Sequence, residues 1–178
     1  MKTKKFVFYL IGPIEFLDDP DRGWREDFVS LFHKRFPGIH AEFINPVKAS
    51  YLVGKTVLDN ARYAAELKAA RNWTELKDFM DKIWRQDALS VDRSGIIVMW
   101  ARTEKELKEA SASVGSIREM LRLVEREGRV YLICDTTLNM TIASTHFLHI
   151  VLSSGCIFDS IEKFFEHFEQ AYGPVCTE

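Results

Sequence analysis

Five short, mostly continuous apolar runs are spread along the chain, and they constrain its fold more than any other feature. Runs of this length bounded by polar residues are typical of strands that a parallel sheet buries on both faces. Four are clear and the fifth is weaker: "KFVFYLI" from Lys5, "HAEFINP" from His40, "GIIVMW" from Gly95, "RVYLIC" from Arg129 and "CIF" from Cys156.

Helical patterns fill the intervals between these runs. They are "GWREDFVSLFHKRF" from Gly23, a long stretch from about Val57 to Ser90, "SIREMLRLVEREG" from Ser116, and "DSIEKFFEHFEQAYG" from Asp159, with Asp159 or Ser160 as the expected N-cap. Alternating strands and helices predict an α/β fold, a flavodoxin-like open parallel sheet of about five strands with helices on both faces. In such folds, ligands bind at the carboxyl ends of the strands.

With 178 residues, the chain is long enough for one hydrophobic core, so we expect a single domain over residues 1–178. The helical excursion around residues 54–90 is longer than one crossover needs. It reads as two helices, the second opened by Asn72 or Thr74. Residues 54–71 are then either packing on the edge of the sheet or a lid over the site.

Composition excludes several classes of function. The net charge of −2 with dispersed basic residues argues against binding a nucleic acid polymer. No run is long enough for a membrane helix, and we expect a cytoplasmic protein with no membrane partner. Three widely spaced cysteines and five histidines without ligand spacing predict no metal site, and nothing predicts a cofactor.

Polar residues follow or flank the predicted strands. Gly12 and Pro13 make a rigid turn after the first strand and allow close approach of a ligand to the backbone. Asp87 lies near the end of a helix, where the helix dipole opposes a carboxylate, which favours a functional role. Glu119 is expected in the first turn of a helix, where the dipole holds it ionised. Alternatively, Ser116 and Glu119 form a capping box.

Three of these segments, in order, resemble the nucleoside 2-deoxyribosyltransferase family. "FYLIGPIE" resembles the family's first strand and loop, "RQDALSVDRSGIIVMW" its R-x-x-D-L segment, and "GSIREM" its G-T/S-x-x-E helix start, followed by the strand "GRVYLI". The similarity covers roughly residues 5–135. One departure is Gly95, which stands where the family's strand signal carries an acid.

The resemblance implies specific roles for residues of this chain. Glu119 takes the place of the nucleophile, Asp87 that of the proton donor and positioner, and Tyr9 that of the tyrosine that orients the nucleophile. Gly12, Pro13 and Ile14 would line the sugar pocket. The helix start at Gly115 and Ser116 would, by its position, offer free backbone N–H groups to an anionic part of the substrate. Asn139, or else Ser144, would reach the site of a second subunit, which implies a homodimer or larger assembly.

The resemblance also bears on the substrate. Ser113 stands six residues before Glu119, where nucleoside-using members carry Asp and the related nucleoside 5′-monophosphate N-glycosidases carry a phosphate-binding serine. Ser111 or Ser116 could take that place instead. Glu15 could accept hydrogen bonds from a base or sugar, or be solvated. Trp24 could stack on a base, or pack as an anchor at the start of its helix.

The implied activity is cleavage of the N-glycosidic bond of a (deoxy)nucleoside or its 5′-monophosphate through a covalent glycosyl-glutamate, with transfer to another base or to water. Two alternatives stay open. One is an NAD-type glycohydrolase of TIR-like architecture, and the other is a nucleotide-binding module without activity, in which Glu119 only caps a helix. The sequence does not decide the base, the sugar or the 5′ group.

Overall fold

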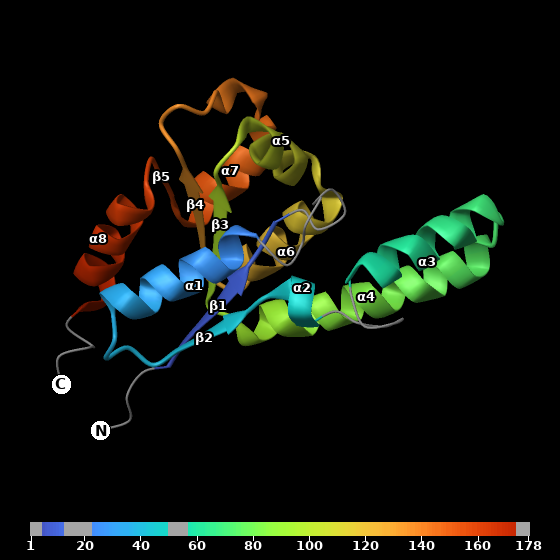
Figure 1. The fold of residues 1–178 in the computed structure, drawn as a ribbon, viewed down its shortest axis with the longest axis horizontal. Helices are drawn as coiled ribbons and strands as arrows, with labels where there is room; N and C mark the ends of the chain where they lie inside the picture. The colour runs from blue at the N-terminus through green and yellow to red at the C-terminus, as the bar shows by residue number, and fades with distance from the viewer. Residues whose placement is uncertain (1–4, 13–22, 50–56, 174–178) are drawn as a thin grey trace.

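The protein is built on a five-stranded parallel sheet with strand order β2-β1-β3-β4-β5 (Figure 1). The computed structural model describes residues 5–12, 23–49 and 57–173. All five predicted strands are confirmed, and so is the predicted flavodoxin-like fold. The strands are β1 Phe6–Leu10, β2 Ala41–Ile44, β3 Ile96–Ala101, β4 Arg129–Cys134 and β5 Cys156–Phe158.

Helices cover both faces of the sheet. Helices α1 (Trp24–Arg35) and α8 (Ile161–Tyr172) pack on one face, in a core rich in phenylalanine that includes Phe8, Phe28 and Phe168. Helices α4 (Trp73–Arg93), α6 (Val114–Val124) and α7 (Thr145–Ser154) pack on the other, around aliphatic residues such as Ile97. The shorter elements are α2 Pro46–Ala49, α5 Glu104–Ala112 and the 3-10 turn η2 Met140–Ile142.

The alternation of side chains along β1 sets the position of the candidate site. Phe8 and Leu10 enter the phenylalanine-rich core, whereas Tyr9 and Ile11 point to the opposite face, toward α6. The chain order also reverses between β1 and β3, which makes the carboxyl end of β1 a topological switch point. Tyr9 therefore lies where ligands bind in open α/β sheets.

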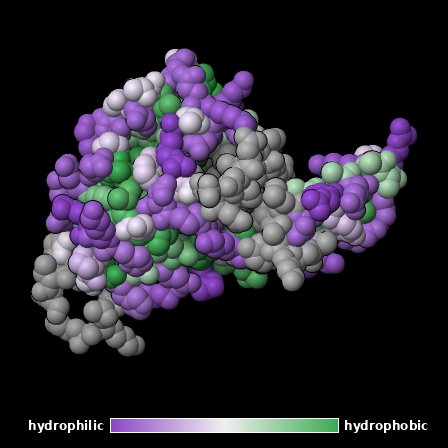
Figure 2. Space-filling view, viewed as in Figure 1, coloured by the Kyte–Doolittle hydropathy of each residue, from purple (hydrophilic) through white to green (hydrophobic). Residues whose placement is uncertain are grey.

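The predicted pair of helices is a hairpin that projects from the sheet (Figure 1). Helix α3 (Val57–Ala69) packs on α4 through Ala64, Leu67 and Phe79, and the hairpin carries many hydrophilic residues on the face shown in Figure 2. Of the two expected openings of α4, Asn72 is the N-cap, and its side chain accepts from the Glu75 amide at 3.3 Å. Residues 54–56 lie outside the described part of the chain.

Helix α7 is an element that the sequence patterns did not predict. It connects β4 to β5 and buries Phe147, Ile150 and Val151 against the aliphatic core. Its sequence "THFLHIVLSS" is apolar enough to resemble a strand, so its helical period is hard to recognise. None of the helices in the described ranges combines the length and the hydropathy needed to span a membrane.

Candidate functional site

Tyr9 and Glu119, 110 residues apart in the sequence, meet beside the carboxyl end of β1. The Tyr9 hydroxyl donates a hydrogen bond to Glu119 Oε1 at 3.2 Å. Both side chains are buried, with exposed fractions of 1% and 8%. The structure thus brings together two of the candidate catalytic residues that the sequence predicted.

The start of α6 differs from the expected one. Ser113 is the N-cap, and its Oγ accepts from the Ser116 amide at 3.3 Å, so the helix begins at Val114. Glu119 consequently lies in the second turn of the helix. The predicted capping box between Ser116 and Glu119 is therefore wrong. Because the cap is provided by Ser113, the Glu119 side chain is available to bond Tyr9 across the core.

The expectation that the helix dipole holds Glu119 ionised is also wrong. The pKa of Glu119 is raised from 4.5 to about 8, chiefly by burial and also by the negative charge of Asp87. The Tyr9 hydrogen bond and the charge of Arg25 act in the opposite direction. Burial, helped by the charges of Glu119 and Asp87, holds the pKa of the Tyr9 hydroxyl well above its usual value, so Tyr9 stays a donor.

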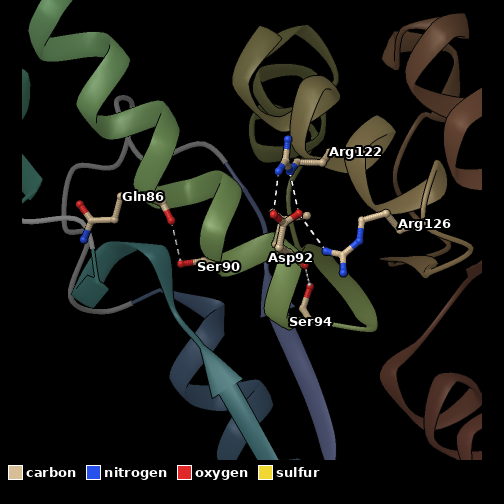
Figure 3. A network of polar contacts seen from close by, with 7 residues as sticks. Gln86, Ser90, Asp92, Ser94, Arg122 and Arg126 are labelled. Carbon is tan, nitrogen blue, oxygen red and sulfur yellow. Dashed lines mark hydrogen bonds and ion pairs between the residues drawn. The ribbon is translucent and has the colours of Figure 1, made fainter.

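Asp87 reaches this cluster from α4. Its side chain is half-buried, and its charge acts on both Tyr9 and Glu119. Nearby, Asp92 joins α4 to α6 (Figure 3). Its carboxylate accepts from Arg122 Nε and Nη2, both at 2.7 Å, and from Arg126 Nη1 at 2.8 Å. This network fixes the helix that carries Asp87 against the helix that carries Glu119.

Helix α1 contributes two buried side chains behind the end of β1. Trp24 is 4% exposed and packs edge-on against Phe28, with ring centroids 6.3 Å apart, which is the contact expected of a helix-start anchor. Arg25 donates to the carbonyl oxygens of Leu10 and Gly12. The sequence patterns assigned no role to Arg25. Its one signal is that a cation in the first turn is opposed by the helix dipole.

The remaining predicted substrate-binding residues are dispersed. Ser113 is half-buried, Gly115 is exposed, and Ser116 is buried at the start of α6, near the cluster in sequence. Asn139 lies in the exposed segment after β4, where its side chain accepts from Thr141 and caps η2. Ser144 is the N-cap of α7, and Ser111 bonds the Lys108 carbonyl within α5. Pro13, Ile14 and Glu15 lie outside the described residues.

A cavity of about 370 Å³ opens elsewhere, between the ends of β4 and β5. Its lining includes Cys134, Thr136, Met140 and Phe158. The titratable groups Tyr9, Asp87 and Glu119 are not among its lining residues. We place the candidate site at these three groups and not at the cavity, because catalysis requires titratable side chains that act together. Within the described ranges, no three His, Cys, Asp or Glu side chains gather as metal ligands would.

A buried carboxylic acid with a raised pKa, a second carboxylate and a tyrosine donor form a recognised kind of catalytic arrangement. Two carboxyl groups whose surroundings give them different proton affinities can act as nucleophile and acid. The site therefore has the groups needed for covalent chemistry at an electrophilic carbon.

Comparison with known proteins bears on the fold. No protein-family model matches the chain, and no curated protein matches it. Among solved structures, a conserved protein from Enterococcus faecalis V583 is similar, with a TM-score of 0.58 and 11% sequence identity over 94% of this chain and 99% of that chain. This likeness shows a shared fold.

Proposed function

We propose that the protein is a nucleoside 2-deoxyribosyltransferase-like enzyme that cleaves the N-glycosidic bond of (deoxy)nucleosides or their 5′-monophosphates. The observation that carries this proposal is the buried Glu119 carboxyl group, bonded by Tyr9 and acted on by Asp87 at the switch point of the sheet. The motifs that resemble the family contain these same three residues.

The reaction proceeds in two displacements. Glu119 forms a bond from its carboxylate oxygen to C1′ of the sugar while the bond from C1′ to the base nitrogen breaks, and Asp87 gives a proton to the leaving base. A second base or a water molecule then attacks C1′ and releases Glu119, with Asp87 taking up the proton. Two displacements at one carbon retain its configuration.

The protonation of the pair suits this sequence of steps. Because the two carboxyl groups repel each other's charge, they hold one proton between them near neutral pH, and the raised pKa of Glu119 assigns it there in the free protein. As positive charge develops at C1′, it favours the ionised form of Glu119. The proton is then best held by Asp87, which needs it to protonate the base.

The start of α6 offers a place for a 5′-phosphate. Ser113 accepts from the Ser116 amide, which leaves its hydroxyl proton free to donate. A β-carbon on exposed Gly115 would approach Ser113 Oγ at 3.7 Å, so the glycine leaves room beside the hydroxyl. A serine here admits a phosphate that an aspartate would repel. We therefore favour 5′-monophosphates as substrates.

The test is a chromatographic assay with deoxynucleosides and their 5′-monophosphates, each with and without a second free base. We expect the protein to release base from monophosphates, and Glu119→Gln to lower turnover at least ~10³-fold while ligand affinity is kept. Glu125→Gln is the matched control, because Glu125 lies exposed at the end of the same helix.

Each other outcome has a defined meaning. Exchange of bases between unphosphorylated nucleosides would make the enzyme a transferase and would refute the phosphate role of Ser113. Release of nicotinamide from NAD instead would favour the glycohydrolase alternative. Ligand binding that Glu119→Gln leaves unchanged, with no turnover by the wild type, would contradict the enzymatic proposal and favour a binding module.

We further propose that the protein works as a homodimer or larger assembly in the cytoplasm, in nucleotide salvage. Seven large apolar residues are exposed in the described part of the chain. Three lie on α4, two on α6, one on α7 and one on α1: Trp73, Met80, Leu89, Val114, Leu121, Leu152 and Leu31. The free thiols of Cys134 and Cys156 agree with a reducing compartment.

A further inference from the structure

Among the residues that the structure describes, Arg25 and Glu119 are the most deeply buried members of the charged amino acids. Their exposed fractions are 1% and 8%. Arg25 comes from α1 and Glu119 from α6, helices that pack on opposite faces of the sheet. Arg25 contacts the backbone at the end of β1, and Glu119 contacts the side chain of Tyr9 in the same strand.

Arg25 holds the backbone where β1 ends. Its Nε donates to the Leu10 carbonyl at 2.9 Å, and its Nη2 donates to the Gly12 carbonyl at 3.0 Å. The amide of Ile11, between them, donates to Val98 of β3 at 3.0 Å. Arg25 and β3 thus clamp three consecutive residues, directly after Tyr9.

The fit around the guanidinium is close. Its central carbon lies 5.1 Å from the centroid of the Trp24 ring, a cation–π contact. A β-carbon on Gly12 would lie 3.0 Å from Arg25 Nη2, a tight contact that would force the guanidinium to shift, so the close approach of this strand end favours glycine. The Arg25 contact is therefore a structural reason for glycine at this position.

The positive charge is retained despite burial. The pKa of Arg25 is lowered from 12.5 to about 10, chiefly by burial, with opposing contributions from Tyr9, Glu26, Glu119 and Glu106. The guanidinium consequently stays charged at neutral pH. The groups that act on Glu119 are Asp87 from α4, Tyr9 from β1 and Arg25 from α1, and Arg25 is the cation among them.

We propose that Arg25 is a positioning residue, which fixes the strand end that carries Tyr9, the hydrogen-bond donor to Glu119, and places a buried positive charge beside that strand end. This inference rests on the proposed function, in which Glu119 must ionise to attack the sugar. Arg25 donates its hydrogen bonds to carbonyl oxygens, so it acts on Glu119 without neutralising it in an ion pair. A carboxylate oxygen of Glu119 is then not engaged by Arg25 and can attack C1′ of the sugar.

The test is the titration of Glu119, followed by NMR of glutamate labelled with ¹³C at the side-chain carboxyl and assigned with Glu119→Gln. Arg25→Met should move the midpoint upward by about one pH unit, because it removes the cation. Arg25→Lys should stay near the wild type, because it keeps the charge. The control Arg35→Met removes an exposed arginine of the same helix, paired with Glu169, and should leave the midpoint unchanged.

Turnover separates the positional role from the charge. Lysine lacks the planar fork whose two nitrogens, Nε and Nη2, reach the Leu10 and Gly12 carbonyls, so Arg25→Lys should release base about tenfold more slowly even though the Glu119 midpoint is kept. If Arg25→Met does not fold, Arg25→Gln is the neutral replacement, since its amide can still donate to a carbonyl.

An unchanged Glu119 midpoint in the neutral variants, whatever their loss of thermal stability, would overturn the proposal and leave Arg25 as backbone support. The titration needs no substrate, so it decides on Arg25 even if the wild type releases no base. In that case the proposed function would fail by itself. A shifted midpoint together with base release by the wild type would support both.

Discussion

Glu119 lies in the second turn of α6, close to a helix N-terminus that favours a carboxylate, yet burial raises its pKa to about 8. The dipole acts over one turn, whereas desolvation acts on the whole buried group, and desolvation is the larger effect here. The helix position of a carboxylate therefore does not predict its charge unless its burial is known.

The raised pKa predicts that stability falls with rising pH. Between pH 4.5 and about 8, the folded protein binds a proton on Glu119 that the unfolded chain has released, so the contribution is full below pH 4.5 and is lost as pH rises through about 8. Glu119→Gln removes this pH dependence. At pH 8.5 its free energy of unfolding should exceed that of the wild type by a few kcal/mol. Urea unfolding at pH 5.5, 7 and 8.5 measures it.

The matched control for this titration is Glu125→Gln, which removes an exposed carboxylate from the same helix. Its stability should follow the wild-type pH dependence. Parallel pH dependences of the wild type and Glu119→Gln would show that Glu119 is not the buried group that loses its proton on unfolding.

At the scale of elements, the site depends on how α4 and α6 lie against each other. Asp87 and Glu119 are on different helices, and the described contacts that join these helices near the site include the Asp92 network and the Trp84 ring, over which Arg118 lies at 3.7 Å. The Arg122 guanidinium holds the pKa of Asp92 below its usual value, so this link stays charged at neutral pH.

Asp92→Asn should slow base release clearly while changing the free energy of unfolding only slightly. The pairs of Asp92 are partly exposed, and exposed pairs add little to stability, but a shift of α4 by a fraction of an ångström would separate Asp87 from Glu119. We expect base release about tenfold slower, with a small, salt-sensitive change in the urea midpoint.

Asp81→Asn provides the comparison, because Asp81 pairs with Lys77 inside α4 and does not link helices through that pair. It should leave turnover unchanged. Equal turnover in both variants and the wild type would mean that the Asp92 network does not position the site.

At the scale of the whole molecule, the exposed apolar residues are distributed unequally. Helices α6 and α7 lie side by side and expose Val114, Leu121 and Leu152, whereas α1, on the other face of the sheet, exposes Leu31. Exposed apolar side chains on neighbouring helices are typical of interaction surfaces. A second copy of the chain seated on the α6 and α7 face would cover them.

We expect the protein to be dimeric or larger in light scattering coupled to size exclusion, and Leu121→Glu to shift it toward the monomer, because a carboxylate would be buried in the interface. Leu31→Glu is the control, with similar exposure on the opposite face: 37% against 43% for Leu121. A monomeric wild type, or equal effects of the two substitutions, would contradict this assembly.

The sequence by itself determined the sheet, and most of its helices. The apolar runs from Lys5, Gly95 and Arg129 form strands because a run without a polar face can be satisfied only where both faces are covered. Helix α7 escaped recognition because its short sequence crowds five apolar residues between Phe147 and Leu152, which resembles a buried strand. Local patterns also left two candidates for the opening of α4, of which Asn72 is the cap.

Only the tertiary structure decided how the candidate site is built. The start of α6 was misplaced because Ser113 and Ser116 are both good caps, and the choice depends on what the helix packs against. The burial of Arg25 and the protonation of Glu119 depend on Tyr9, Asp87 and the end of β1, which are brought together from distant parts of the chain. A carboxylate's charge is set by its surroundings in space, and a sequence specifies those surroundings only through the fold.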